Sequence, residues 1–103
     1  TEIILTTPPE CYKRTYVKKK RIYVRNENTE KAAATLRQIA QEEGIVCWDL
    51  FTATGGKNSC RKWQTQHLLS KDRIHFTQRG YQDQGVLLYR ALMNAYNAHL
   101  DKE

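Results

Sequence analysis

Residues 72–81 read DRIHFTQRGY, and this stretch decides how the rest of the chain is interpreted. Asp72 and His75 stand three positions apart, immediately before a segment with helical periodicity. This spacing lets the carboxylate reach one ring nitrogen of the imidazole, as in the base-and-orienter half of a nucleophilic triad. A histidine that accepts a proton needs such a carboxylate to fix its tautomer and to stabilise its charge. On spacing alone, a surface Asp beside a packed His at a helix start is the commoner case.

The C-terminal helix is the clearest element in the sequence. Apolar residues recur at helical intervals after Gly80, which predicts a helix over about residues 78–100 with Thr77 as its N-cap. The apolar stripe consists of Tyr81, Leu88, Leu92, Ala95, Tyr96 and His99. Upstream, residues 52–69 follow no period and predict a long loop with one helical turn. The opening stretch is therefore a helix entrance that also carries an Asp-x-x-His loop, residues 72–75.

Two apolar runs predict parallel strands. Residues 3–5 form a short β-favouring run that ends before a Pro-Pro pair. Residues 45–51, IVCWDLF, form a nearly unbroken apolar run, which is typical of a strand covered on both faces. A helical pattern lies between the two runs, so we expect a parallel pair with a right-handed crossover.

The crossover helix should run from about Thr29 to Glu43. Its apolar positions recur every three or four residues, Asn28 or Thr29 can cap it, and Gly44 provides the stop. Strand, helix, strand and a further helix define an α/β chain.

The basic residues are concentrated in one segment. The net charge is +6, and residues 12–25 carry seven basic side chains and no acidic one, interleaved with three tyrosines. Charge runs are usually solvated, so we expect a basic, mobile loop over about residues 10–28. The alternative is a small nucleic-acid-binding module in which Lys18–Arg21 follows a phosphate backbone.

Length and composition limit the number of domains and the classes of protein to which the chain can belong. With 103 residues and 40% hydrophobic composition the chain fits one domain, and no apolar run approaches the ~20 residues that cross a bilayer. Three cysteines without CxxC spacing indicate neither a disulfide framework nor a zinc site. We therefore expect no membrane span, no metal and no cofactor.

The segment LLSKDRIHFTQRGYQDQGVLLYRALMNAYN, residues 68–97, resembles the C-terminal block of the SGNH, or GDSL-like, hydrolase superfamily. In that superfamily an acid-x-x-His motif is followed by a Gly-Tyr pair that opens the last helix. TTPP after an apolar strand, and the helix leading to IVCWDLF, also resemble the preceding part of that domain. The resemblance implies a partial three-layer α/β/α sandwich with parallel strands, the C-terminal part of a flavodoxin-like SGNH hydrolase fold. It also implies that His75 is a general base and Asp72 its orienting acid in the metal-free hydrolysis of carbohydrate or lipid O-acyl esters, often acetyl esters.

The part of the superfamily domain that the chain resembles does not include the nucleophile. Members take their serine from a Gly-Asp-Ser motif near the domain start and their oxyanion donors from two further blocks, and residues 1–103 contain none of these motifs. Ser59 and Ser70 do not follow a strand into the sharp turn that exposes a nucleophile. We therefore expect residues 1–103 to be a single C-terminal fragment of such a domain, inactive alone. It should need the N-terminal half of the domain or self-association to cover its apolar surface.

Three alternatives to a serine esterase stay open. Cys11, Cys47 or Cys60 can replace the serine, because a thiolate needs only a nearby base. The basic run can bind nucleic acid, which predicts steep salt dependence and no role for His75. The chain can also be a non-enzymatic interaction domain that keeps the hydrolase fold.

Overall fold

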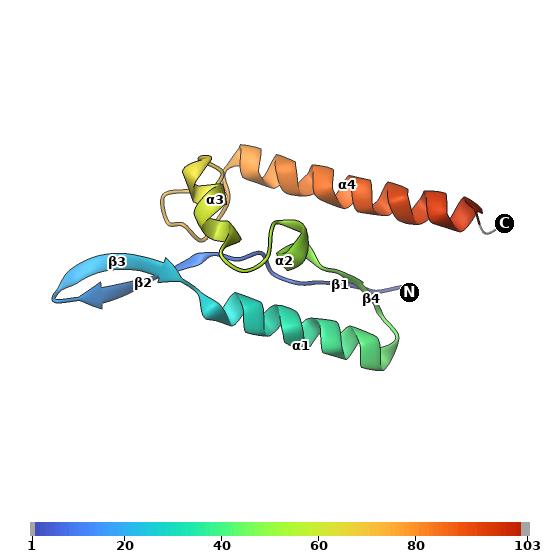
Figure 1. The fold of residues 1–103 in the computed structure, drawn as a ribbon, viewed down its shortest axis with the longest axis horizontal. Coiled ribbons are helices and arrows are strands. Elements are labelled where there is room, and N and C mark those ends of the chain that lie inside the picture. Colours follow the sequence, from blue (N-terminus) through green and yellow to red (C-terminus); the bar gives the residue numbers. More distant parts are fainter. Residues whose placement is uncertain (1, 102–103) are drawn as a thin grey trace.

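The computed structural model describes residues 2–101. In chain order the elements are β1 (Ile4–Thr6), β2 (Tyr12–Val17), β3 (Lys20–Arg25), α1 (Glu27–Glu43), β4 (Val46–Trp48), α2 (Leu50–Ala53), α3 (Ser59–Thr65) and α4 (Gln78–Asp101). Helices α1 and α4 lie on opposite sides of the β1–β4 pair, which makes a partial α/β/α sandwich (Figure 1). Within the described range, no helix combines the length and the apolar character that crossing a membrane requires.

The β1–β4 pair is parallel, as the sequence predicts. Its register pairs Ile4 with Val46, Leu5 with Cys47 and Thr6 with Trp48. The predicted strand over residues 45–51 was too long, because Asp49 ends it and caps α2 by accepting the N–H of Thr52 at 3.3 Å. The hydroxyl of Thr7 donates to Asp49 at 2.8 Å and accepts the N–H of Phe51 at 2.9 Å. The ends of the two strands are thereby fastened together.

Helix α1 begins two residues before the predicted start. Asn26 is its N-cap, with a side-chain oxygen that accepts the N–H of Asn28 at 3.0 Å, so the expectation of Asn28 or Thr29 as the cap was wrong. The predicted stop is confirmed: Gly44 has a φ of 65° and donates its N–H to the carbonyl of Ala40.

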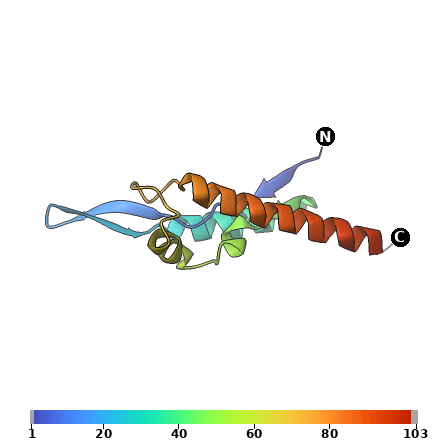
Figure 2. The same cartoon turned by 90° about the horizontal axis from the view of Figure 1, so that it is seen from above.

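The basic segment is a β-hairpin, and the expectation of a mobile loop over residues 10–28 was wrong. Strands β2 and β3 pair antiparallel from Tyr12 opposite Arg25 to Val17 opposite Lys20. The two turn residues, Lys18 and Lys19, have φ values of 50° and 65°, as a two-residue hairpin turn that matches strand twist requires. The hairpin projects from the body of the molecule (Figures 1 and 2).

Residues 52–69 contain more structure than the single turn predicted, because α3 spans Ser59–Thr65. Cys60, Leu69 and Phe76 form a buried cluster, against which Tyr12 and Trp63 pack. Helix α4 begins at Gln78, as predicted, and the Thr77 hydroxyl caps it by accepting the N–H of Gly80 at 3.2 Å. This cluster sets the position of the loop between α3 and α4.

Candidate active site

The candidate site lies on the loop between α3 and α4. An antiparallel bridge between Leu69 and Phe76 closes the loop at its base. Within it, the N–H of Ser70 donates to the carbonyl of His75 at 2.8 Å, and the N–H of Arg73 donates to the carbonyl of Ser70 at 2.9 Å. The backbone of the Asp-x-x-His loop is thus fixed by its own hydrogen bonds and by two buried side chains.

The structure brings Asp72 and His75 together. One carboxylate oxygen lies 2.6 Å from His75 Nδ1, and the other accepts the backbone N–H groups of Ile74 at 2.9 Å and His75 at 3.0 Å. The hydrogen bond from the His75 ring, followed by those two backbone bonds, lowers the pKa of Asp72 to about 2. The ionised carboxylate favours the imidazole tautomer that carries its proton on Nδ1, and in that tautomer Nε2 is the acceptor nitrogen.

The His75 side chain is 70% exposed, so its ring is accessible at the surface. This arrangement can accept a proton from a hydroxyl at Nε2, and the adjacent carboxylate can stabilise the resulting imidazolium.

Neither serine is presented to the imidazole as a nucleophile. The hydroxyl of Ser70 donates to the carbonyl of Phe76 at 3.2 Å. Ser59 is buried, with 7% of its surface exposed, at the start of α3. These positions agree with the expectation that the chain's own serines do not act.

Two of the three thiols are poor substitutes for a serine. Burial raises the pKa of Cys60 to about 12, and the adjacent Glu10 carboxylate adds to the rise. Burial also raises the pKa of Cys11. A protonated thiol is a weak nucleophile, so the Cys–His alternative loses support at both positions.

Glu10 is a buried carboxylate that the sequence analysis did not predict. It stabilises the part of the molecule around β3 and α3. The Glu10 side chain is fully buried and accepts hydrogen bonds from Arg25 Nε at 2.8 Å, the N–H of Asn58 at 2.9 Å and the N–H of Cys60 at 3.3 Å. Burial acts to raise the pKa of Glu10, but the hydrogen bonds together outweigh it and hold the pKa below its usual value. The charged carboxylate joins the end of β3 to the start of α3. No periodic pattern marks such a residue.

The hairpin is attached directly to the Asp-x-x-His loop. The N–H of Tyr12 donates to the carbonyl of Arg73 at 3.0 Å. The Arg73 guanidinium lies over the ring of Tyr23 at 4.5 Å and over that of Tyr12 at 5.5 Å. The basic segment, which the sequence separates from the Asp–His pair by about fifty residues, is therefore its neighbour.

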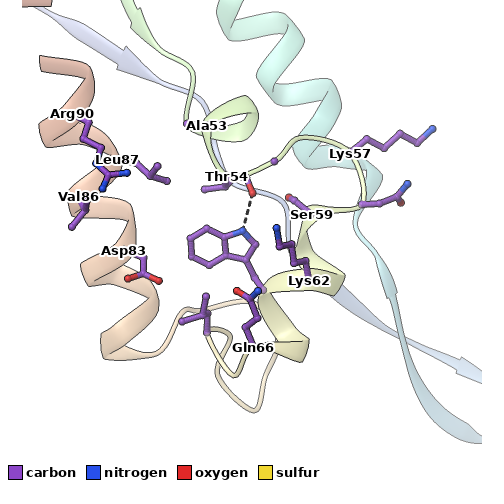
Figure 3. Close-up of a pocket in the computed structure, with 14 residues that line it drawn as sticks. Ala53, Thr54, Lys57, Ser59, Lys62, Gln66, Asp83, Val86, Leu87 and Arg90 are labelled. Carbon is purple, nitrogen blue, oxygen red and sulfur yellow. Dashed lines mark hydrogen bonds between the residues drawn. The ribbon is translucent and has the colours of Figure 1, made fainter. Parts of the chain in front are cut away.

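A pocket lies apart from the Asp–His pair. It has a volume of about 640 Å³, and neither Asp72 nor His75 lines it. Trp63 is one of its lining residues, and the indole N–H donates to the carbonyl of Thr54 at 2.8 Å, a hydrogen bond that is drawn as a dashed line in Figure 3. Lys62, from α3, and Arg90, from α4, are among its lining residues. Among residues 2–101, no group of three or more His, Cys, Asp and Glu could hold a metal ion.

Comparison with known proteins bears on the fold. No protein-family model matches the chain, and a search of curated proteins finds no match. A solved structure of a peptidoglycan O-acetylesterase superposes on 94% of this chain with a TM-score of 0.79 and 24% sequence identity. Over the matched part, the chain shares the α/β fold of that esterase structure. It spans 27% of the length of that esterase chain. The expected fold class is thereby confirmed.

Proposed function

We propose that this chain carries the general base and the orienting acid of a serine ester hydrolase that acts on acyl esters, notably acetyl esters, of a carbohydrate. The observation that carries the proposal is the 2.6 Å contact between His75 Nδ1 and Asp72, whose second oxygen is held by two backbone N–H groups. The fold shared with a peptidoglycan O-acetylesterase supports the reaction class and the carbohydrate.

In the proposed mechanism, the serine comes from a polypeptide segment outside these 103 residues. Nε2 of His75 takes the proton as the serine oxygen attacks the ester carbonyl, and Asp72 stabilises the imidazolium. The imidazolium then gives this proton to the departing alcohol, which leaves an acyl-serine. Water next attacks the acyl carbonyl with His75 again as the base. The imidazolium then returns this proton to the serine oxygen as the bond between that oxygen and the acyl carbon breaks and the carboxylic acid leaves.

In this proposal residues 1–103 supply the base and its orienting acid, which the reaction needs but which are not sufficient for it. A base without its nucleophile and oxyanion donors gives negligible ester turnover, because those groups make the bond and stabilise the developing charge. We expect the chain by itself not to hydrolyse 4-nitrophenyl acetate.

The first test is the coding sequence immediately upstream of residue 1, in which we expect a Gly-Asp-Ser motif. A polypeptide that includes this motif should hydrolyse 4-nitrophenyl acetate. His75→Asn should lower its kcat by about 10⁴–10⁶-fold, and Asp72→Asn by on the order of 10²–10⁴-fold.

The matched control is His67→Asn. His67 is also an exposed histidine of this loop region, and asparagine tolerates its positive φ of 60°. This variant should keep the parental kcat. Parental turnover by His75→Asn would remove His75 from the mechanism. His75-dependent turnover by residues 1–103 alone would instead place the nucleophile within this chain.

A further inference from the structure

The two faces of the hairpin have different chemistry. Side chains of residues directly opposite each other in an antiparallel pair share a face. One face is formed by Tyr12 opposite Arg25, Arg14 opposite Tyr23 and Tyr16 opposite Arg21. The other is formed by Lys13 opposite Val24, Thr15 opposite Ile22 and Val17 opposite Lys20. Each pair on the first face, the Arg/Tyr face, joins one tyrosine to one arginine.

Tyrosine rings hold cations in place along the Arg/Tyr face. The Arg21 guanidinium lies 6.0 Å from the centre of the Tyr23 ring, and the Arg73 guanidinium lies 4.5 Å from the same ring. Arg14 stands directly across the strands from Tyr23. Arg21, Arg14 and Arg73 therefore follow one another from the hairpin turn toward the Asp-x-x-His loop.

Arg25, the third arginine of the Arg/Tyr face, has a structural role. Arg25 pairs with the buried Glu10 and with Glu30, and it fastens the hairpin to α1 and α3. The cations that remain open to a ligand are thus Arg14 and Arg21, both exposed, and the half-buried Arg73. The hairpin strands and turn contain no acidic residue to neutralise them.

We propose that the Arg/Tyr face binds the carboxylates of an acidic polysaccharide and presents its acyl esters to His75; this inference rests on the proposed function and names its substrate class. A planar guanidinium binds a carboxylate through two parallel hydrogen bonds, and a guanidinium held against a ring loses less freedom on binding. Side chains on one face of a strand repeat about every 7 Å, so the row suits an extended polymer with charges along its length. Tyr16, which is 67% exposed, offers its ring to a sugar.

The same face suits a nucleic acid less well. Proteins that hold single strands without sequence preference rely on several open aromatic rings on which bases stack. Arg73 already lies over the rings of Tyr12 and Tyr23, so these two rings are occupied. Guanidiniums, rather than open rings, dominate the face.

The experiment measures binding of a fluorescent polygalacturonate oligomer to the 103-residue chain by anisotropy at fixed salt. Arg14→Gln/Arg21→Gln is compared with Lys13→Gln/Lys20→Gln, which removes the same charge from adjacent positions on the opposite face. The first variant should weaken binding at least about tenfold, since each arginine loses a charge-assisted hydrogen-bonded contact. The second should weaken it by less than about threefold, because only screened long-range attraction is lost. Equal losses would overturn the proposal.

Two further arms test the chemistry of recognition. Arg14→Lys/Arg21→Lys keeps the charge and loses the bidentate fork, and it should also weaken binding; parental affinity in this variant would overturn the proposal. Neutral dextran should not compete for binding. If single-stranded DNA bound more tightly than polygalacturonate at the same salt, the face would belong to a nucleic-acid-binding protein. Circular dichroism of each variant confirms an unchanged fold.

His75→Asn separates this inference from the catalytic proposal. The variant should bind polygalacturonate like the parent, because His75 is not part of the Arg/Tyr face. Full turnover by His75→Asn in the serine-containing polypeptide, with polygalacturonate binding intact, would remove the catalytic proposal and leave the binding site. His75-dependent turnover without polygalacturonate binding would remove the binding site alone.

Discussion

The start of α4 is packed against the rest of the molecule, whereas the apolar side chains of its far part are exposed. At its start, Thr77 caps the helix, Gly80 is buried, and the rings of Phe76 and Tyr81 meet edge to face at 5.7 Å. Further along, large apolar side chains are exposed. They are Val86, Leu88, Tyr89, Leu92, Met93, Tyr96 and Leu100.

The same contrast runs through the rest of the chain. The part of the molecule that contains the hairpin, α3 and the Asp–His loop, called the organised half below, has a buried cluster around Cys60 and Phe76. In contrast, Ile4 and Val46 of the parallel strands are 56% and 65% exposed. The Cα radius of gyration is 16.0 Å, against about 13 Å for a compact domain of 100 residues. The difference indicates that the Asp–His loop is organised within this chain, while the apolar side chains of β1, β4 and the far part of α4 are left exposed. Four predictions test this contrast.

The largest expected effect is on Glu10, which braces the organised half. Glu10→Gln should lower the free energy of unfolding by about 3–5 kcal/mol, because the Arg25 guanidinium loses its buried ionic partner and keeps only the more exposed Glu30. The amide nitrogen would also face a backbone N–H, from Asn58 or from Cys60. Urea unfolding at fixed protein concentration measures the effect. The control is Glu42→Gln on the exposed side of α1, whose carboxylate accepts only a surface hydrogen bond from Gln38 in the described contacts. Equal stability of the two variants would show that Glu10 braces nothing.

Gly80 and Gly85 allow the same substitution to be compared at two places in α4, the packed start and a position further along the helix. A Cβ at Gly80 would lie 2.3 Å from the carbonyl oxygen of Leu68 and 3.0 Å from the Phe76 side chain, so Gly80→Ala should destabilise by about 2–3 kcal/mol. A Cβ at Gly85 would meet nothing within 4 Å, so Gly85→Ala should stabilise by about 0.5–1 kcal/mol through helix propensity. Thermal melts of both variants check the opposite signs. Destabilisation by Gly85→Ala would mean that the far half of the helix is already covered.

Local patterns in the sequence predicted much of this arrangement. Helical periodicity located α4, the two apolar runs located the parallel strands, and a three-residue spacing placed Asp72 against His75. Each of these features depends on residues that are close in sequence or on a regular repeat. Such features survive without knowledge of the tertiary contacts.

The features that sequence reasoning missed depend on special backbone conformations or distant contacts. The hairpin was predicted to be a loop because Lys18 and Lys19 adopt the left-handed conformations of its turn without the usual glycine or asparagine. Glu10 is buried because residues about fifty positions away donate to it, and Arg73 finds its tyrosines across a similar separation. The link between the hairpin and the Asp–His loop was invisible for the same reason.

The exposed half of α4 should drive association of the isolated chain. We expect sedimentation velocity to show concentration-dependent oligomers, because contiguous apolar surface of this kind is covered in stable proteins. Leu88→Gln/Leu92→Gln should shift the chain toward monomer and change its unfolding free energy by no more than about 0.5 kcal/mol. Asn94→Gln/Asn97→Gln, exposed on another side of the same helix, should leave association unchanged. A parent chain that stays monomeric at all concentrations would contradict the expectation that the exposed apolar surface of α4 drives association.

The smallest effect concerns the pH dependence of the Asp–His pair itself. The pKa of Asp72 is lowered from 3.8 to about 2, so the ionised carboxylate favours the folded loop. This stabilisation is complete above the ordinary pKa and is lost as the pH falls through the folded value, which places the loss between about pH 4 and pH 2. NMR titration of the Asp72 carboxyl carbon should give a midpoint near the lower limit. In His75→Asn the ring donor is absent, and since its hydrogen bond is the largest cause of the shift, the midpoint should rise toward the ordinary value. An ordinary midpoint in the parent chain would mean that the Asp72–His75 hydrogen bond does not form in the isolated chain, and that the organised part of the molecule ends before the Asp-x-x-His loop.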